Sequence, residues 1–318
     1  MKVSVVIPTY NREQQVIDLI EYLIHDIKFR NQIVIVDQND SKFILQSNYQ
    51  NVERHFLPDK GTGKARNFGA NQSNSDWICF LDDDVRPIRD FFERASSLLE
   101  VNPWIDVLQP EILQREAWTE YRKSPTEWML KFKSTLAFYR NFPPSDLDGI
   151  QWFMQKPNTA HGVLSLRIGA GAFFIKRDVF FRVGGFDETL TGSGDDSDLA
   201  IRLWWHGYRT YYYPQVVAFH LHSASGGLRE SKSKTTWLNN LFRPEPNPGV
   251  VYFYKKWFPG FPAYSFYVYY LLKNKKQLFF PVKLLRLMIA IRSANKLITT
   301  GAQYINHVEP KPRMELGS

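Results

Sequence analysis

The chain has 318 residues, of which 44% are hydrophobic and 23% charged, so wholesale disorder is excluded and a sizeable core is expected. Its single cysteine excludes a disulfide framework and a zinc site built from cysteines. The net charge of +8 fits nucleic acid, an anionic substrate or an anionic membrane as a partner, and the total alone does not choose among them.

The first hundred residues alternate short apolar stretches with amphipathic ones. We expect strands at residues 3–7, 33–36, 52–57 and 77–81, and helices at 13–25, 62–74 and 87–100. This βαβα order predicts an α/β fold with a mostly parallel, doubly wound sheet. Because ligands of such sheets bind beyond the carboxyl ends of the strands, the polar residues that follow the strands are the first candidates for a site.

The second part of the chain is less regular. A fifth strand is expected near residues 105–109, and residues 111–162 are interpreted as helices and a long loop. Strands at 169–176, 210–213 and 216–219 and a helix at 195–206 follow. The N-terminus lacks the pattern of a signal peptide, and no apolar run reaches the roughly 18 residues of a spanning helix, so we expect a cytoplasmic protein.

Three consecutive aspartates, Asp82, Asp83 and Asp84, follow the strand at 77–81. Carboxylates crowded in this way raise one another's pKa unless a cation neutralises them, and their oxygens suit Mg²⁺ or Mn²⁺. Such a metal would bridge the phosphates of a nucleotide. The alternative is a solvated acidic turn, with Asp84 capping the helix that follows residue 87.

Two further signals are weak when taken alone. Asp37 ends the second strand at the same sheet edge, and it either contacts a nucleobase or ribose or is an ordinary turn residue. Lys64 and Arg66 lie in the glycine-containing stretch 60–67. The backbone N–H groups and cations of this stretch suit an anion, although a simple helix N-terminal turn has the same pattern.

Acidic residues also gather in the first turn of the helix at 195–206. Capping is the simple interpretation, but Asp195, Asp196 and Asp198 exceed what a cap needs, and a carboxylate beside a cleft can take a proton from a hydroxyl nucleophile. His220 and His222 alternate along an extended segment, so both project to one face, either as metal ligands or as structural residues.

In combination these segments resemble glycosyltransferase family 2, the inverting nucleotide-sugar transferases with the GT-A fold. The matching segments, in chain order, are VVIPTYNR at 5–12, IVD at 35–37, GKARNFG at 63–69, FLDDD at 80–84, GGFDE at 184–188 and GDDSDL at 194–199. The resemblance covers roughly residues 1–225 and implies a catalytic domain over 1–245, with a nucleotide-binding half at 1–110 and an acceptor half at 111–245.

The resemblance also implies residue roles. It makes Asp196 the general base. It makes Asp84 a metal ligand together with His220, with His222 as the alternative to His220. The implied metal is Mn²⁺ or Mg²⁺, and the histidine ligand favours Mn²⁺. The implied nucleotide-sugar contacts are Pro8, Thr9, Tyr10, Arg12, Asp37, Lys64, Arg66, Asp82, Asp83 and Asp195. We expect residues 223–236 to close over the donor.

The expected activity is non-processive transfer of a sugar, with a UDP-sugar as donor, to a hydroxyl of a glycan or lipid-linked saccharide in surface polysaccharide synthesis. The QxxRW motif of processive members is absent. Two alternatives compete with this activity. A catalytically silent sugar-nucleotide or glycan-binding module is disfavoured by the complete set Asp84, Asp196 and His220. A nucleotidyltransferase normally needs a long glycine- and arginine-rich N-terminal loop, which is absent here.

The positive charge is concentrated in the region 246–318. Residues 246–308 contain nine Lys or Arg and no Asp or Glu, so residues 1–245 are close to neutral. Aromatic residues and an apolar helical stripe accompany these basic residues, a pattern typical of helices that lie on anionic bilayers. We therefore expect a helical, basic and aromatic extension that makes peripheral contact with the inner face of the cell membrane, with packing on the core as the alternative and nucleic acid disfavoured.

Overall fold

The computed structural model describes residues 1–39, 49–124, 163–165, 168–169, 171–190, 194–222, 244, 246–257, 267–268, 270–272 and 280–300. Its strands are β1 (Val3–Thr9), β2 (Ile33–Asp37), β3 (Val52–Phe56), β4 (Trp77–Leu81), β5 (Val85–Pro87), β6 (Val107–Gln114), β7 (Val163–Ser165), β8 (Ala172–Lys176) and β9 (Thr210–His220). Its helices are α1 (Glu13–Glu21), α2 (Thr62–Gln72), α3 (Phe91–Val101), α4 (Arg115–Lys123), α7 (Arg177–Arg182), α8 (Asp195–Trp205), α10 (Pro248–Trp257) and α12 (Phe280–Thr300).

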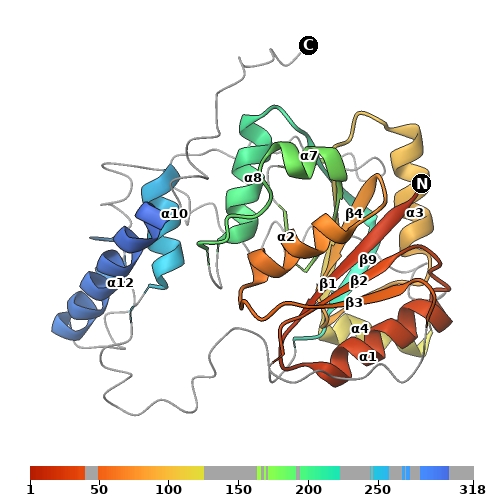
Figure 1. Ribbon diagram of the computed structural model, residues 1–318, viewed down its shortest axis with the longest axis horizontal. Coiled ribbons are helices and arrows are strands. Elements are labelled where there is room, and N and C mark those ends of the chain that lie inside the picture. Colours follow the sequence, from red (N-terminus) through yellow and green to blue (C-terminus); the bar gives the residue numbers. More distant parts are fainter. Residues whose placement is uncertain are drawn as a thin grey trace.

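One mixed sheet runs through the molecule in the order β3-β2-β1-β4-β8-β6-β9-β5, with β7 paired to β9 (Figure 1). The half formed by β3, β2, β1 and β4 is parallel, as the βαβα pattern predicts. The other half contains antiparallel ladders between β4 and β8, β6 and β8, and β5 and β9. The sheet is therefore parallel where it is wound by helices and mixed beyond β4.

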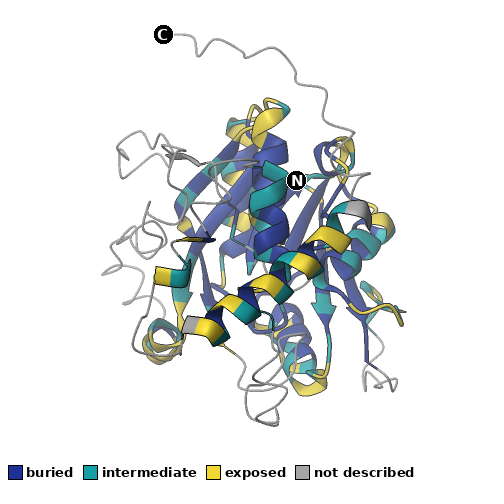
Figure 2. Ribbon diagram, turned by 90° about the vertical axis from the view of Figure 1, so that its left-hand side faces the viewer, coloured by how far each residue is buried: buried dark blue, intermediate teal, exposed yellow. Residues whose placement is uncertain are grey.

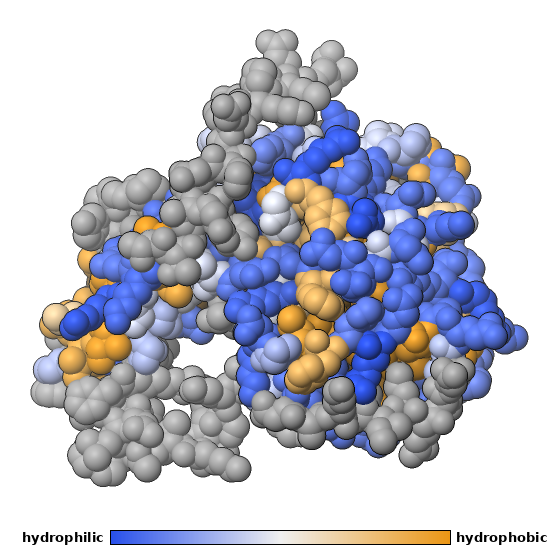
Figure 3. Space-filling view, in the orientation of Figure 1, coloured by the Kyte–Doolittle hydropathy of each residue, from blue (hydrophilic) through white to orange (hydrophobic). Residues whose placement is uncertain are grey.

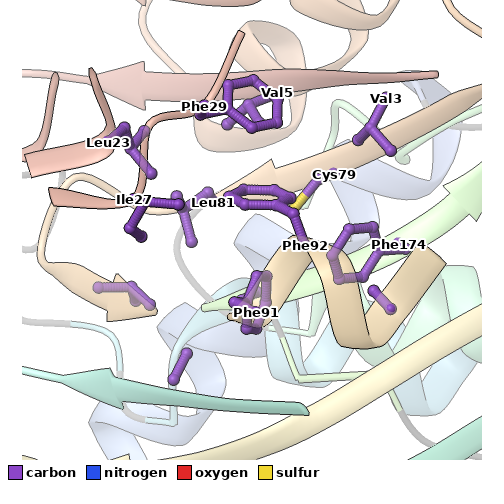
Figure 4. Packing of buried hydrophobic residues seen from close by; sticks show 14 of the residues in the cluster. Val3, Val5, Leu23, Ile27, Phe29, Cys79, Leu81, Phe91, Phe92 and Phe174 are labelled. Carbon is purple, nitrogen blue, oxygen red and sulfur yellow. The ribbon is translucent and has the colours of Figure 1, made fainter. Parts of the chain in front are cut away.

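Helices cover both faces of this sheet. Alternate side chains of the central strands belong to two separate cores: Val5 packs with residues of α1 and α3, whereas Val6 packs with residues of α2, α7 and α8. Figure 4 shows the first core, where Cys79 and Leu81 of β4 lie among the aromatic rings of α3. β1, β2, β4 and β8 are buried almost throughout (Figure 2), which explains their near-continuous apolar sequences.

Glycine allows the closest helix–sheet approach. A Cβ on Gly69 of α2 would lie 2.4 Å from Val6 Cγ1 and 3.0 Å from Val36 Cγ2, so no larger residue fits without displacing β1 or β2. This contact seats α2, and with it Arg66, against the strands that end at the candidate site.

The bounds of several expected elements differ from those observed, and three elements differ in kind. The helix expected at 13–25 ends at Glu21 and continues as a π-helical turn over Tyr22–Asp26. The helix expected at 87–100 begins only at Phe91, and Pro87 instead ends β5, which pairs with β9. The two strands expected at 210–213 and 216–219 are one strand, β9, whose pairing with β6 shifts register between Pro110 and Glu111. β5 has only three residues, and the irregularity in the pairing of β6 with β9 is local, so neither produces a hydrophobic pattern long enough to be identified from the sequence.

The C-terminal helices pack on the rest of the chain. Tyr252 and Phe253 of α10 and Leu287 of α12 share a buried cluster with Leu190 and with Ile201 of α8. Within the described residues, no helix is long and apolar enough to cross a membrane. The boundary at residues 245/246 stays a prediction, and α10 makes direct contact across it.

Candidate active site

The three consecutive aspartates are held by two arginines, Arg66 and Arg12. Asp82 accepts a hydrogen bond from Arg66, and Asp83 accepts hydrogen bonds from Thr9 Oγ1 at 2.8 Å and from Arg12 Nη1 at 2.8 Å. Asp84 contacts Arg12 Nη1 at 3.1 Å. The side chains predicted around the aspartates thus lie together at the carboxyl ends of β1 and β4, which are parallel neighbours.

Arg66 joins the aspartates to the start of α8. Its guanidinium donates to Asp82 Oδ1 at 2.7 Å and to Asp195 Oδ2 at 2.9 Å, and its side chain is only 1% exposed. The ring of Phe186 lies 5.2 Å from the guanidinium carbon. Since the two carboxylates come from segments 113 positions apart in the sequence, the planar fork of Arg66 holds the two halves of the candidate site together.

Burial changes the acidity of these groups. The pKa of Asp83 is raised to about 6, because burial outweighs the stabilising contacts with Arg12 and Thr9. The pKa of Asp82 is also raised by burial, against the opposing influence of Arg66. Burial thus disfavours the charged form of both carboxylates, and the contacts with Arg66 and Arg12 offset part of this cost.

Asp84 lies beside His220 because β5 pairs with β9. The register places Val85 opposite His220, and His220 Nε2 lies 3.5 Å from Asp84 Oδ1. His222 has a positive φ of 48°, its ring lies 4.0 Å from the His220 ring, and its Nε2 contacts Gln114 Oε1. The structure therefore favours His220 over His222 as the partner of Asp84.

The donor set can be tested against the expected metal. In the described part of the chain, no group of three or more His, Cys, Asp or Glu is arranged to hold an ion. Asp84 and His220 offer one carboxylate oxygen and one imidazole nitrogen. Mg²⁺-like ions in nucleotide sites commonly take only one or two protein ligands, with phosphate and water in the remaining positions. The pair fits a metal that arrives with a diphosphate, and does not fit an all-protein metal site.

Asp196 lies in the first turn of α8, after Gly194, which adopts a left-handed conformation with a φ of 91°. Its carboxylate is partly buried and accepts a hydrogen bond from the Ser197 backbone N–H at 2.8 Å. Burial and the neighbouring Asp195 raise the pKa of Asp196 to about 6. A group with this pKa is mostly ionised at neutral pH and retains enough basicity to accept a proton.

The predicted base and ribose contacts lie along β1 and β2. Asp37 is fully buried and pairs in register with Thr9, and Arg54 donates to its Oδ2 from Nε at 3.0 Å and from Nη2 at 2.6 Å. Pro8, on β1, and Tyr10 are partly buried, and Lys60 lies 4.8 Å from the centre of the Tyr10 ring.

Lys64 does not join this group in the structure. It lies two residues before Arg66 on α2, but its Nζ is 3.4 Å from Asp59 Oδ2 at the surface. Its predicted role at the nucleotide stays a prediction. The expected lid at 223–236 and most of the segment 111–162, interpreted as helices and a long loop, lie outside the described residues.

Sequence reasoning missed two arginines that shape the site. Arg54 lies on β3 diagonally from Asp37, whose direct partner is Phe56. This diagonal cross-strand position is the feature of the sequence that could have identified Arg54 as a partner of Asp37. Arg86 of β5 is buried and donates to the carbonyls of Asp83, Val85 and Gln15. Its contacts all go to backbone carbonyls, so no side-chain pattern identifies it.

The chain is similar to known glycosyltransferases in sequence and in fold. The profile described as Glycosyl transferase family 2 matches residues 4–160. An uncharacterized glycosyltransferase of Haemophilus influenzae is 26% identical over 208 residues, which are 63% of this chain and 61% of the relative. The pre-mycofactocin glycosyltransferase of Mycobacterium tuberculosis is 29% identical over 168 residues, which are 53% of this chain and 32% of the relative. The chain thus spans less than two thirds of the length of these relatives.

Two solved structures share the fold. GalNAc-T7, solved with UDP, GalNAc and Mn²⁺, superposes with a TM-score of 0.56 at 16% identity, over 98% of this chain and 59% of that one. Staphylococcus aureus TarS 1-349, in complex with UDP-GlcNAc, gives 0.50 at 15% identity, over 95% of this chain and 74% of that one. The predicted family and fold are confirmed: the chain carries a glycosyltransferase family 2 domain with the GT-A fold.

Proposed function

We propose that the protein is an inverting, metal-dependent glycosyltransferase that moves a sugar from a nucleotide-diphosphate sugar to a hydroxyl group. The observation that carries the proposal is the bridge made by Arg66, which holds Asp82 at the end of β4 and Asp195 in the first turn of α8. Asp82 of the proposed donor site and the proposed base, Asp196, thereby belong to one cluster of charges around Arg66.

The proposed reaction is a single displacement. Asp196 takes the proton of the acceptor hydroxyl, the hydroxyl oxygen forms a bond with the anomeric carbon, and the bond from that carbon to the diphosphate oxygen breaks. The nucleoside diphosphate leaves, and the configuration at the anomeric carbon is inverted. Since the pKa of Asp196 is about 6, its carboxylate is ionised before the reaction at neutral pH.

A divalent metal, held by Asp84 and His220, would neutralise the charge that develops on the leaving diphosphate. Mn²⁺ is the favoured ion because one of the two donors is an imidazole nitrogen. Arg12 contacts both Asp83 and Asp84 and is a second source of positive charge at the same place. The chain's own contribution is thus to hold the diphosphate and to keep the base oriented.

We propose a UDP-sugar as the donor, because the GalNAc-T7 and TarS structures were solved with UDP or UDP-GlcNAc. The proposed acceptor is a glycan or lipid-linked saccharide in surface polysaccharide synthesis, with non-processive addition. The direct test is a thermal-shift panel of nucleotide sugars with Mn²⁺, followed by a transfer assay with the donor that stabilises the protein most. Stabilisation by no nucleotide sugar would contradict the proposal.

The assay also separates the alternatives. A silent binding module binds the donor but yields neither transfer nor donor hydrolysis with Mn²⁺ present. A nucleotidyltransferase instead releases pyrophosphate from a nucleoside triphosphate. In the proposed enzyme, D196N retains nucleotide binding and loses transfer, because an amide cannot accept the proton.

We further propose peripheral membrane contact at the cytoplasmic face through the region 246–308, which includes α12. Leu284 and Met288 of α12 are 39% and 60% exposed, and Figure 3 shows hydrophobic surface over this helix. The basic residues of α12 contribute less positive charge to its exposed surface than the sequence indicates, because Lys283 and Arg286 are buried. Figure 2 shows exposed positions recurring along α12.

Liposome flotation tests the membrane proposal. The wild type is expected to float with vesicles that contain anionic lipid, and L284E/M288E to remain at the bottom, because the substitutions charge the exposed apolar positions without touching the core. Equal flotation of the two proteins would remove α12 from the membrane proposal.

A further inference from the structure

One lysine of α10 bridges two buried carboxylates of the domain that precedes it. Lys256 Nζ lies 2.8 Å from Asp187 Oδ2 and 2.6 Å from Asp198 Oδ1. The Lys256 side chain is 1% exposed, and both aspartate side chains are 0% exposed. The basic character of the C-terminal region therefore includes at least one charge that faces inward, contrary to the expectation that its lysines serve a membrane.

The two aspartates have further partners from the same helix. Tyr252 donates its hydroxyl to Asp187 Oδ2 at 2.7 Å, and Trp257 donates its indole N–H to Asp198 Oδ1 at 2.8 Å. Arg202 of α8 binds the other oxygen of Asp198 at 2.8–2.9 Å. Two carboxylates and two cations thus form a closed network, which offsets the cost of burying each charge.

Each aspartate belongs to a segment that shapes the candidate active site. Asp198 lies in the first turns of α8, two residues after Asp196. Asp187 belongs to the turn 184–188, which Asn67 of α2 holds through hydrogen bonds to the backbone N–H of Phe186 at 2.8 Å and its carbonyl at 2.9 Å. A single ammonium group therefore connects the start of α8 to the turn that α2 supports.

α10 also contacts the point where α8 begins. A Cβ built on Gly194, the N-cap of α8, would lie 3.8 Å from Phe253 Cβ and 3.8 Å from Leu190 Cδ2. A side chain at position 194 would therefore point toward Phe253 of α10 and Leu190. The N-cap is a glycine and makes no side-chain hydrogen bond, so the first turn of α8 depends on contacts from other segments, which include Arg66 to Asp195 and the packing of Phe253 beside Gly194.

We propose that Lys256 is a positioning residue for the transfer reaction: through Asp198 and Asp187 it fixes the first turn of α8 and so the orientation of the Asp196 carboxylate. This inference rests on the proposed function, in which Asp196 is the base. It makes α10 a structural part of the catalytic unit. The ammonium group of lysine suits the place because its N–H donors share one nitrogen, and oxygens of both carboxylates converge on that nitrogen at 2.8 Å and 2.6 Å.

The expected effect of removing the ammonium is local. In K256M, Asp198 keeps Arg202 and Trp257, and Asp187 keeps Tyr252, so each carboxylate retains a donor. The lost element is the connection between the two segments. A displaced base reduces the rate of the chemical step on the order of tenfold to a hundredfold while donor binding, which uses residues of β1, β4 and α2, is retained.

The experiment compares K256M with K255M in the full chain. Lys255 is the neighbouring lysine of α10 and contacts Asn295 of α12 instead of the network. We expect K256M to lower kcat with the donor KM unchanged, and K255M to behave as the wild type. Hydrogen exchange is expected to accelerate in peptides covering 194–200 in K256M and not in K255M, with no acceleration in β1 or β4.

The exchange measurement separates this inference from the proposed function. If wild type transfers no sugar but K256M still accelerates exchange at 194–200, the function fails and the positioning of α8 stands. If kcat and the exchange rates of K256M equal those of the wild type, the inference is wrong. If kcat, donor KM and exchange throughout the sheet change together, Lys256 is only a stability residue. Should K256M not fold, D187N/K256M, which removes one charge of each sign, is measured under the same criteria.

Discussion

The bridge formed by Arg66 allows a quantitative prediction for R66M. Its guanidinium makes two charged hydrogen bonds, at 2.7 Å to Asp82 and 2.9 Å to Asp195, in a place where the arginine is 1% exposed. A hydrogen bond to a charged group contributes roughly 1.5–3 kcal/mol, so the two together give about 3–6 kcal/mol. This agrees with the roughly 3–5 kcal/mol lost when one partner of a buried ion pair is removed.

The loss should depend on pH. Without the guanidinium, the pKa of Asp82 rises beyond its already raised value, and the pKa of Asp196 rises above about 6, because Arg66 lowers both. The folded variant then binds more protons than the unfolded chain between the ordinary carboxyl pKa and these raised values, so its stability increases as the pH falls. We expect the deficit of R66M relative to the wild type to be smaller at pH 5 than at pH 8.

Urea unfolding followed by tryptophan fluorescence measures this difference at both pH values. R66K is the matched control, since it keeps the charge but loses the fork that reaches both carboxylates, and its deficit should be intermediate. A deficit below about 1 kcal/mol in R66M, or one that is equal at pH 5 and pH 8, would refute the reasoning.

Three further predictions follow from the geometry. G69A should lose about 1–3 kcal/mol in urea unfolding, because its Cβ would lie 2.4 Å from Val6 Cγ1, and a wild-type midpoint would show that α2 shifts freely. In the wild type, kcat should fall about tenfold per pH unit below a pH of about 6 as Asp196 is protonated, and a flat profile from pH 5 to 8 would argue against Asp196 as the base. H220A should raise the Mn²⁺ concentration needed for half-maximal transfer far more than H222A, and equal effects would reject the choice between the two histidines.

The sequence predicted the elements that carry a clear period. β4 was predicted with its observed bounds, because its five residues form one apolar run. α8 was predicted to within one residue, because an amphipathic pattern begins directly after a glycine. The same locality accounts for Asp82, Asp83 and Asp84, which follow directly from a buried strand.

Contacts between distant segments had no such signal. β5 is only three residues long, and the pairing that brings His220 to Asp84 depends on a register that no local pattern contains. Lys256 was assigned to a basic surface, since nothing in its neighbourhood indicates a carboxylate 69 residues earlier in the chain. Residues that act through tertiary contacts are therefore found only when the fold places their partners.

The most direct test of the proposed activity is the stereochemical course of transfer, followed by NMR, with the nucleotide sugar that stabilises the protein most in the presence of Mn²⁺. The proposed mechanism predicts a product whose anomeric configuration is opposite to that of the donor, and no product from D196N under conditions where this variant binds the donor as the wild type does. Retention of configuration, or transfer by D196N at the wild-type rate, would contradict it.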